Sequence, residues 1–352
     1  MADLAVTRCA VPTVRGRSTY TVVGFAGYGV ANLLAAALFV AWELPFVDRV
    51  IAAFAPGVAF LLVVRIARAI AGAEVIVFYQ VAATGMVAAG LLDAAFGEQP
   101  ARVADIVTIG IGAFLVLGRF GCFAVACCHG RPARFGIVYG DAHVAVGFWP
   151  RWRGRRLWPT QMIESAVSLA LVVAGLAAGW SRPGLPALIY IVGYAPVRFA
   201  LELVRGDWAR PHRWGLSEAQ WTAPVTAIAC AIWRPHPVTV AVAAVLVIAA
   251  AMLVARRRRR ELFEPPHLRD LDQSCAAAAH SQTRAETSLG VAVSRFQMPD
   301  GRIDWVLSSS HPRWSTATAR RLAALMWPRY ELVEGRLAGV VHVVVGDPRP
   351  PE

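Results

Sequence analysis

Long apolar runs separated by short polar segments dominate the first 255 or so residues of the chain. A helix of about 20 apolar residues is long enough to cross a hydrocarbon core of about 30 Å. Runs of this length lie at about 20–42, 50–70, 75–96, 103–127, 161–180, 184–204 and 237–255, and a shorter, ambiguous run lies at 217–233. Because backbone in lipid must satisfy its own hydrogen bonds, the pattern predicts an all-α polytopic membrane helix bundle with seven or eight transmembrane helices.

The pattern changes after residues 256–260, a run of five arginines that follows the last apolar run. The next segment is polar and Ala-rich, which is typical of a linker. Farther on, the residues predict two strands joined as a hairpin, a helix and a further strand, at 289–297, 303–309, 315–330 and 339–345. We therefore divide the chain into a transmembrane region (1–255), a basic stop and linker (256–287), and a small α+β soluble C-terminal domain (288–352).

Composition also indicates a membrane protein, because 57% of the residues are hydrophobic, 16% are charged and the mean hydropathy is +0.50. In a soluble protein, the formal net charge of +12 would suggest a nucleic-acid partner. Here the arginines lie mostly in loops and beside apolar runs, where anionic lipid headgroups attract them. We expect a multi-pass membrane protein that binds anionic lipids and no nucleic acid, with its first apolar run retained rather than cleaved as a signal.

Arg119 lies at the end of the fourth apolar run, where burial of a charged side chain costs free energy. An arginine at a helix centre costs about 2.5–3.5 kcal/mol on insertion scales, so Arg119 predicts an anionic partner such as a phosphate or a carboxylate. Gly118, Gly121 and Gly130 would let a ligand approach the backbone closely.

A second charged group lies at the end of the sixth run. The spacing of Arg198, Glu202 and Arg205 puts all three on one helix face. A glutamate there can hold one arginine in position while another binds an anion. The alternative is a charge ladder that only joins helices.

Cys122, Cys127, Cys128 and His129 follow Arg119 closely. Cysteine and histidine are zinc ligands, but the spacing C-x4-C-C-H matches no recognised finger, and a free cysteine often packs as a small buried hydrophobe. A redox or acyl-carrying thiol is a further alternative. We expect no metal, and the absence of a P-loop or dinucleotide fingerprint predicts no cofactor.

The longest connection between apolar runs, residues 129–159, carries several arginines together with Trp149, Trp152 and Trp158. Connections of this length usually carry function or disorder, and tryptophan is enriched at membrane interfaces. The segment is predicted to be a surface arm at headgroup level.

The order of three motifs resembles the prolipoprotein diacylglyceryl transferase family. These are G-R-x-G-C-F-x-x-x-C-C-x-G at 118–130, P-T-Q-x-x-E at 159–164 and R-F-x-x-E-x-x-R at 198–205. Tyr28-Gly29 in the first run and G-L-S-E-A-Q at 215–220 are also similar to short family motifs. The resemblance covers roughly residues 20–235 and leaves the C-terminal part outside.

This resemblance implies an enzyme of lipoprotein biosynthesis in the bacterial inner membrane. Its reaction would move a diacylglyceryl group from phosphatidylglycerol to the lipobox cysteine of an exported preprotein, with phosphate as the leaving group. Such a thiol alkylation needs cations on the phosphate and a field or base that favours the thiolate. The residues expected to serve catalysis are Arg119, Arg198, Glu202, Tyr79 and His129. Those expected to bind substrate are Tyr28, Gly118, Gly121, Gly130, Arg205 and Gln161.

The sequence departs from the family at positions usually tied to acid–base chemistry, which makes it a divergent member. Tyr79 stands in place of the histidine of a His-Gly-Gly motif, and a tyrosine, with a pKa of about 10, is a poor base unless strongly perturbed. Cys122 and Cys127 replace an Asn and a Glu. His129 is a candidate substitute acid–base residue, or a headgroup contact. The alternative function is a catalytically altered or inactive relative that acts as a lipid-binding membrane scaffold.

Membrane orientation is predicted differently by charge and by resemblance. The arginine distribution favours eight helices with both ends of the chain in the cytoplasm. The resemblance implies an external N-terminus and seven crossings. We favour seven crossings, in which 217–233 and 237–255 do not both span.

Overall fold

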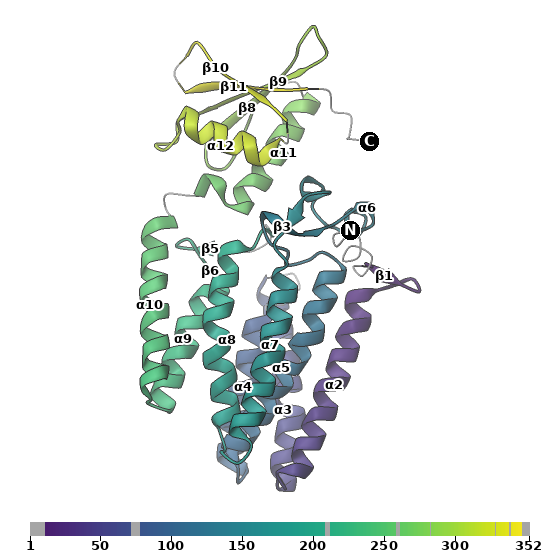
Figure 1. The fold of residues 1–352 in the computed structure, drawn as a ribbon, viewed down its shortest axis with the longest axis vertical. Helices are drawn as coiled ribbons and strands as arrows, with labels where there is room; N and C mark the ends of the chain where they lie inside the picture. The colour runs from purple at the N-terminus through teal and green to yellow at the C-terminus, as the bar shows by residue number, and fades with distance from the viewer. Residues whose placement is uncertain are drawn as a thin grey trace. The chain divides into compact units, whose positions relative to one another are not determined.

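The computed structural model describes residues 11–71, 78–207, 212–257, 261–281, 283–327, 329–337 and 339–346. The chain forms two compact units, residues 1–207 with 216–251 and residues 208–215 with 252–352. The first unit is a bundle of long helices that run side by side (Figure 1). Its helices are α2 (Thr19–Ala41), α3 (Phe46–Ala71), α4 (Phe78–Phe96), α5 (Pro100–Ala124), α7 (Thr160–Gly179), α8 (Leu185–Val204), α9 (Glu218–Trp233) and α10 (Pro237–Arg257).

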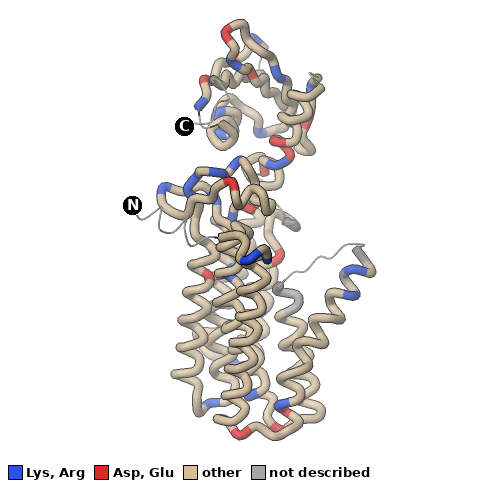
Figure 2. Tube along the Cα trace, turned by 90° about the vertical axis from the view of Figure 1, so that its right-hand side faces the viewer, with Lys and Arg blue, Asp and Glu red and all other residues tan. Residues whose placement is uncertain are grey.

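These helices confirm the predicted membrane bundle. Among the described residues, six are long and apolar enough to cross a membrane: α2, α3, α5, α7, α8 and α10. Residues Ala82–Phe96 of α4 form a shorter apolar helix, and α9, with 16 residues, is about 24 Å long. Figure 2 shows that charged residues gather mainly at the two ends of the bundle and leave the middle of most helices uncharged.

Helix α5 is the centre of the bundle, because it packs against α2, α4, α7 and α8. Val103, Ile106 and Ile109 of α5 are at most 1% exposed and join Tyr190 of α8 in the main apolar cluster. Close approach of these helices depends on Gly112. A Cβ atom there would lie 2.5 Å from the Tyr190 ring and 2.7 Å from a methyl group of Val172.

Replacing Gly112 by alanine is therefore expected to destabilise the bundle by about 1–3 kcal/mol, the range seen when a packed core is overfilled. Gly110 on the same helix is a matched control, since a Cβ there meets nothing within 4 Å. The variant Gly110→Ala should be neutral or slightly stabilising. Thermal unfolding of the purified protein in detergent compares the two, and equal losses would contradict the packing argument.

The connection between α5 and α7 is a folded substructure, which corrects the predicted surface arm. It contains β3 (Pro132–Val138) paired antiparallel with β4 (Arg156–Leu157), a short helix α6 (Asp141–Val144) and a 3-10 turn η1 (Pro150–Trp152). Trp149 and Trp152 pack against each other and are 4% and 2% exposed. Their rings therefore fill a small core instead of anchoring at an interface. The unit also has the short strands β1 (Thr13–Val14), β2 (Arg17–Ser18) and β6 (Leu216–Ser217).

The second unit holds an antiparallel sheet in the order β10-β11-β9-β8-β7. The strands are β7 (Ala285–Glu286), β8 (Val291–Gln297), β9 (Ile303–Ser309), β10 (Glu331–Glu334) and β11 (Val340–Val345). Helix α11 (Pro265–Ser281) packs against β7 and β8, and α12 (Thr316–Met326) packs against β11. A 3-10 turn η2 (Glu261–Phe263) and the short strand β5 (His212–Arg213) complete the unit.

The sheet confirms a small α+β C-terminal region, including the hairpin β8–β9 and a helix capped by Ser315, whose hydroxyl accepts from the Thr318 amide. The segment predicted as linker is different. It forms α11, whose buried residues Leu268, Leu271, Cys275 and Ala278 make one apolar stripe. The low average hydrophobicity of this segment concealed the stripe, because a helix that packs on a single face needs few apolar residues.

His267 is a buried titratable group in this second unit. Its Nδ1–H donates to the Leu262 carbonyl (2.7 Å), and its Nε2 accepts from the Thr287 hydroxyl (3.1 Å). Burial lowers the pKa of His267 below its ordinary value, and Asp270 opposes this shift only in part. The unfolded chain takes up a proton near pH 6.5, whereas the folded unit does so at a lower pH.

The stability of the second unit is therefore expected to be constant above about pH 6.5 and to fall below it, toward the folded pKa of His267. Amide hydrogen exchange of β8 and β9 at several pH values, corrected for intrinsic exchange, measures this. The variant His267→Gln should make the stability of the second unit less dependent on pH. The exposed His280 serves as the control, and His280→Gln should leave the pH dependence unchanged.

Candidate active site

Three buried charged residues meet where α5 ends, α7 begins and α8 ends (Figure 1). Glu164 on α7 lies between two arginines: Arg119 Nη2 is 2.9 Å from Glu164 Oε1, and Arg198 Nε is 3.5 Å from the same oxygen. The Tyr194 hydroxyl also donates to that oxygen. One carboxylate thus joins α5 to α8.

A row of ion pairs continues from Arg198 along the end of α8. Glu202 pairs with Arg198, and Arg205 Nη1 lies 3.4 Å from Glu202 Oε1. Arg205 then donates to both carboxylate oxygens of Asp207, from Nε (2.7 Å) and from Nη2 (2.8 Å). The structure thereby brings Arg119 together with Arg198, Glu202 and Arg205, although they are far apart in the sequence.

The charges of this row balance, because three arginines face three carboxylates: Glu164, Glu202 and Asp207. A buried charge without a partner is costly, so the balance explains why the arginines tolerate burial of 6% exposure or less. Arg119 nevertheless keeps spare donor capacity. Among the described residues, its Nε–H has no hydrogen-bond acceptor. A guanidinium with a free N–H in a water-poor place is suited to an oxyanion such as a phosphate.

The start of α7 fixes the turn that follows α5. Gln161 Nε2 donates to the Cys127 carbonyl (2.6 Å), and the Thr160 hydroxyl donates to the Cys128 carbonyl (2.8 Å). Gln161 is 1% exposed, so it acts on the backbone turn and is not displayed at a surface. The motif P-T-Q-x-x-E therefore has two tasks, since its first residues hold the turn while Glu164 holds the arginines.

The same turn is joined to the end of α8. Gly130 and Arg205 form an antiparallel bridge, in which the Arg131 amide donates to the Val204 carbonyl (2.7 Å) and the Gly206 amide donates to the His129 carbonyl (2.9 Å). This contact places the α5–β3 turn directly against Arg205.

The three predicted glycines play different parts. At Gly130 a Cβ atom would lie 2.3 Å from the Trp158 Cβ, so only glycine fits. At Gly121 a Cβ would lie 3.3 Å from the Tyr20 Cα, a tight crossing with α2. At Gly118 the nearest atom would be 3.4 Å away, an ordinary contact with Phe114.

His129 is 4% exposed and, among the described residues, its ring forms no hydrogen bond with the arginines. Its Nδ1 lies 2.9 Å from the Gly130 carbonyl oxygen, and its ring packs edge-on against Phe148. Burial lowers the pKa of His129, so the ring is neutral at pH 7. A role as acid or base for this residue stays a prediction.

Two other predicted residues do not join the cluster. Tyr28 on α2 is 62% exposed on the outside of the bundle. Tyr79 belongs to the first turn of α4, but its side chain lies outside the described part of the chain.

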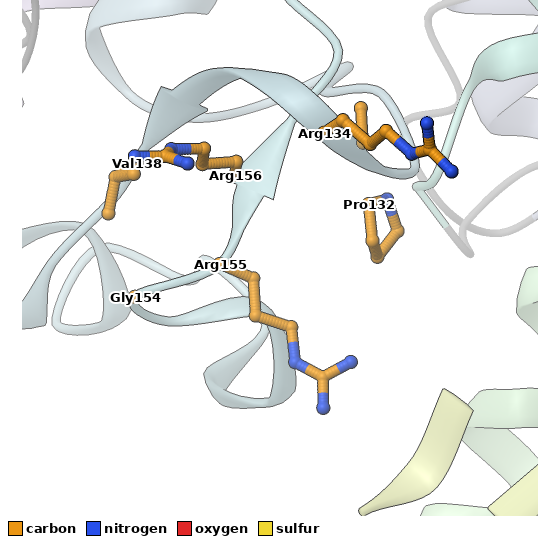
Figure 3. Close-up of a pocket in the computed structure, with 7 residues that line it drawn as sticks. Pro132, Arg134, Val138, Gly154, Arg155 and Arg156 are labelled. Carbon is orange, nitrogen blue, oxygen red and sulfur yellow. The ribbon is translucent and has the colours of Figure 1, made fainter. Parts of the chain in front are cut away.

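Two hollows lie in the first unit. A small apolar crevice of about 60 Å³ runs between α4, α5, α8 and α9 and reaches Tyr194 and Arg198. Its lining suits an apolar chain more than a polar group. An open hollow of about 510 Å³ lies on the β3–β4 pair, and Figure 3 shows Arg134, Arg155 and Arg156 around it.

Comparison with known proteins shows which family part of the chain resembles. The sequence model for prolipoprotein diacylglyceryl transferase matches residues 76–234. Over these residues the chain is similar to the prolipoprotein diacylglyceryl transferases. Phosphatidylglycerol–prolipoprotein diacylglyceryl transferase 2 of Clostridium perfringens is 29% identical over 113 residues, and the transferase of Clostridium tetani is 26% identical over 110 residues. These alignments cover 30% of this chain and about two fifths of the length of each relative.

The prolipoprotein diacylglyceryl transferase match contains the whole charged row, from Arg119 to Asp207, together with the turn that Gln161 holds. Tyr28 and the second unit's sheet lie outside it.

Sequence reasoning did not assign a role to Glu164, Tyr194 or Asp207, which the structure places at the centre and end of the charged row. Glu164 gave a usable signal, because a carboxylate inside an apolar run needs a partner just as an arginine does. Tyr194 gave no such signal, since a tyrosine in an apolar helix usually serves only in packing.

Proposed function

We propose that the chain transfers a diacylglyceryl group from phosphatidylglycerol to the thiol of a lipobox cysteine in a preprotein. The observation that carries this proposal is the buried row of arginines at one end of the bundle, with the free Nε–H of Arg119 among the described residues. The names of the similar transferases support the two substrates.

The proposed reaction requires the phosphate of the lipid to leave with the electron pair of a carbon–oxygen bond. Fixed cations stabilise the charge that develops on that phosphate, and they do so more strongly in a water-poor site than in water. Arg119 is the proposed primary phosphate ligand. Arg198 and Arg205 add positive potential, while Glu164 and Glu202 position the guanidinium groups.

The proposed location is the bacterial inner membrane, where the charged row would lie near headgroup level. The apolar crevice beside Arg198 supports this placement, because an acyl chain next to a phosphate needs an apolar neighbour. The arginines of the β3–β4 hollow are proposed to attract anionic headgroups.

The test uses the purified full chain in vesicles that contain phosphatidylglycerol labelled in an acyl chain, together with a lipobox peptide. Transfer of label to the peptide is expected, and a peptide with serine in place of cysteine should stay unlabelled. Binding of phosphatidylglycerol by folded protein without any transfer would overturn the proposal and favour a lipid-binding scaffold. No observation on this chain at present favours the scaffold.

A further inference from the structure

Three thiols come together at the end of α5. The sulfur atoms of Cys122, Cys127 and Cys128 all lie within 4.8 Å of one another, and all three cysteines are reduced. Zinc bound to thiolates has Zn–S bonds of about 2.3 Å, so tetrahedral coordination separates the sulfurs by ~3.8 Å. The observed cluster needs a contraction of about 1 Å at most to meet this geometry.

The backbone that gathers these thiols is strained and firmly held. Ala126 and Cys128 adopt left-handed conformations, with φ of 57° and 55°, which turn the chain back onto the helix end. Such conformations cost free energy in residues other than glycine and persist only where the surroundings enforce them. Gln161 and Thr160 supply that enforcement through the carbonyls of Cys127 and Cys128. These hydrogen bonds fix the backbone that carries the Cys127 and Cys128 thiols.

The cluster offers three possible ligands. Within the described part of the chain, no further histidine, cysteine, aspartate or glutamate joins the group. His129 is held elsewhere by the Gly130 carbonyl and by Phe148. Structural zinc sites use four protein ligands, whereas catalytic zinc sites use three and leave one position open. Cys127 and Cys128 are only half-buried, so part of the cluster is accessible from outside the bundle core.

The location of the cluster connects it with the charged row. Cys122 and Arg119 are three residues apart on α5, so they are neighbours on the helix surface with Cβ atoms about 5–6 Å apart. A ligand at the open position would therefore lie beside a phosphate bound to Arg119.

We propose that Cys122, Cys127 and Cys128 form a three-thiolate zinc site whose open position binds the acceptor thiol as a thiolate. This inference rests on the proposed transferase function and supplies it with the thiol activation that Tyr79 is poorly suited to give. A thiol that binds zinc loses its proton, because the ion stabilises the thiolate directly.

The chemistry balances without an oxidant or reductant. The acceptor thiol releases its proton to water when its sulfur binds zinc. The sulfur then attacks the glycerol carbon that carries the phosphate, a carbon–sulfur bond forms, and the carbon–oxygen bond breaks. The electron pair leaves with the phosphate, which departs as glycerol phosphate next to Arg119, and the thioether product dissociates from the metal.

Metal binding is tested first, without any activity measurement. Full-length protein in detergent is stripped with a chelator, loaded with Zn²⁺ or Co²⁺, and passed over a desalting column. One equivalent of metal per chain is expected, and the Co²⁺ form should show a thiolate-to-cobalt charge-transfer band. Serine at any one of Cys122, Cys127 or Cys128 should weaken binding by about 100-fold or more, above the effect of losing an orienting hydrogen bond.

The buried Cys230 on α9 is the matched control, and Cys230→Ala should keep one equivalent of metal and the same spectrum. Thermal unfolding of each variant separates loss of a ligand from loss of folding. Absence of bound metal in folded wild-type protein, or retention of the charge-transfer band in a folded triple-serine variant, would overturn the site.

A last measurement separates this inference from the proposed function. Adding the lipobox peptide should change the visible spectrum of the Co²⁺ protein, whereas the serine peptide should not. Transfer that persists in stripped protein or in the triple-serine variant would disprove the role of the metal while leaving the transferase intact. Peptide-dependent spectral change without any transfer would instead support the site and count against the function.

Discussion

Arg119→Ala is expected to lower diacylglyceryl transfer by about 10²–10³-fold or more, the loss seen when one preorganised donor to a developing oxyanion is removed. Arg119 is buried, is bound to Glu164 at 2.9 Å and, among the described residues, has no hydrogen-bond acceptor for its Nε–H. Its removal takes away the proposed ligand of the departing phosphate. Glu164 keeps Arg198 and Tyr194 as partners, so folding should survive.

Arg102 is the matched control for this experiment. It lies on the same helix, about 25 Å from Arg119 by helix rise, and it is also buried at 8% exposure. Its partners are Asp105 at 3.6 Å and the Trp180 carbonyl at 2.9 Å. Transfer by Arg102→Ala should stay within a few-fold of wild type. If both variants lose activity equally, the loss reflects the bundle as a whole and the assignment of Arg119 is wrong.

Arg119→Lys sharpens the same test. Lysine keeps the positive charge but lacks the planar fork that can hold Glu164 and an oxyanion at once. Partial activity is expected, above that of Arg119→Ala and below wild type. The measurement is the transfer rate at saturating phosphatidylglycerol, which separates the chemical step from lipid binding.

Glu164→Gln is expected to be the most destabilising single change in the bundle, at about 3–5 kcal/mol, the range for breaking a buried ion pair by removing one partner. Glu164 is 3% exposed, forms ion pairs with Arg119 and Arg198, and accepts a hydrogen bond from the Tyr194 hydroxyl. A neutral amide leaves Arg119 without an opposite charge and presents an N–H₂ group to two guanidinium groups. Transfer should be lost with the stability.

Tyr194→Phe removes only the hydrogen bond from Tyr194 to Glu164 and leaves both ion pairs in place. Its expected cost is about 0.5–1.5 kcal/mol, typical of a single hydrogen bond. Thermal unfolding in the same detergent measures the loss of stability in both variants. A smaller loss for Glu164→Gln than for Tyr194→Phe would contradict the view that Glu164 is the centre of the row.

The sequence alone predicted the long helices of the membrane region closely. Apolar runs at 103–127 and 184–204 correspond to α5 and α8. Such helices can be predicted because the length and hydrophobicity of a single segment decide whether it spans the bilayer. The sequence also identified Arg119 and the Arg198 to Arg205 face as unusual, because a charge in an apolar run is costly wherever it lies. In the second unit, alternation and turn residues predicted the β8–β9 hairpin.

Tertiary structure decided which of these residues meet. Glu164 became the centre of the row only when α7 packed between α5 and α8, and no local pattern encodes that crossing. The three thiols gather because a strained turn, held by Gln161, folds Cys127 and Cys128 back onto Cys122, so their linear spacing hid the cluster. Helix α11 and the core around Trp152 were likewise missed, since each depends on a partner surface far away in the chain. The sequence determines the charge and hydrophobicity of each residue. The distances between side chains, which make a site, are set only when the helices pack.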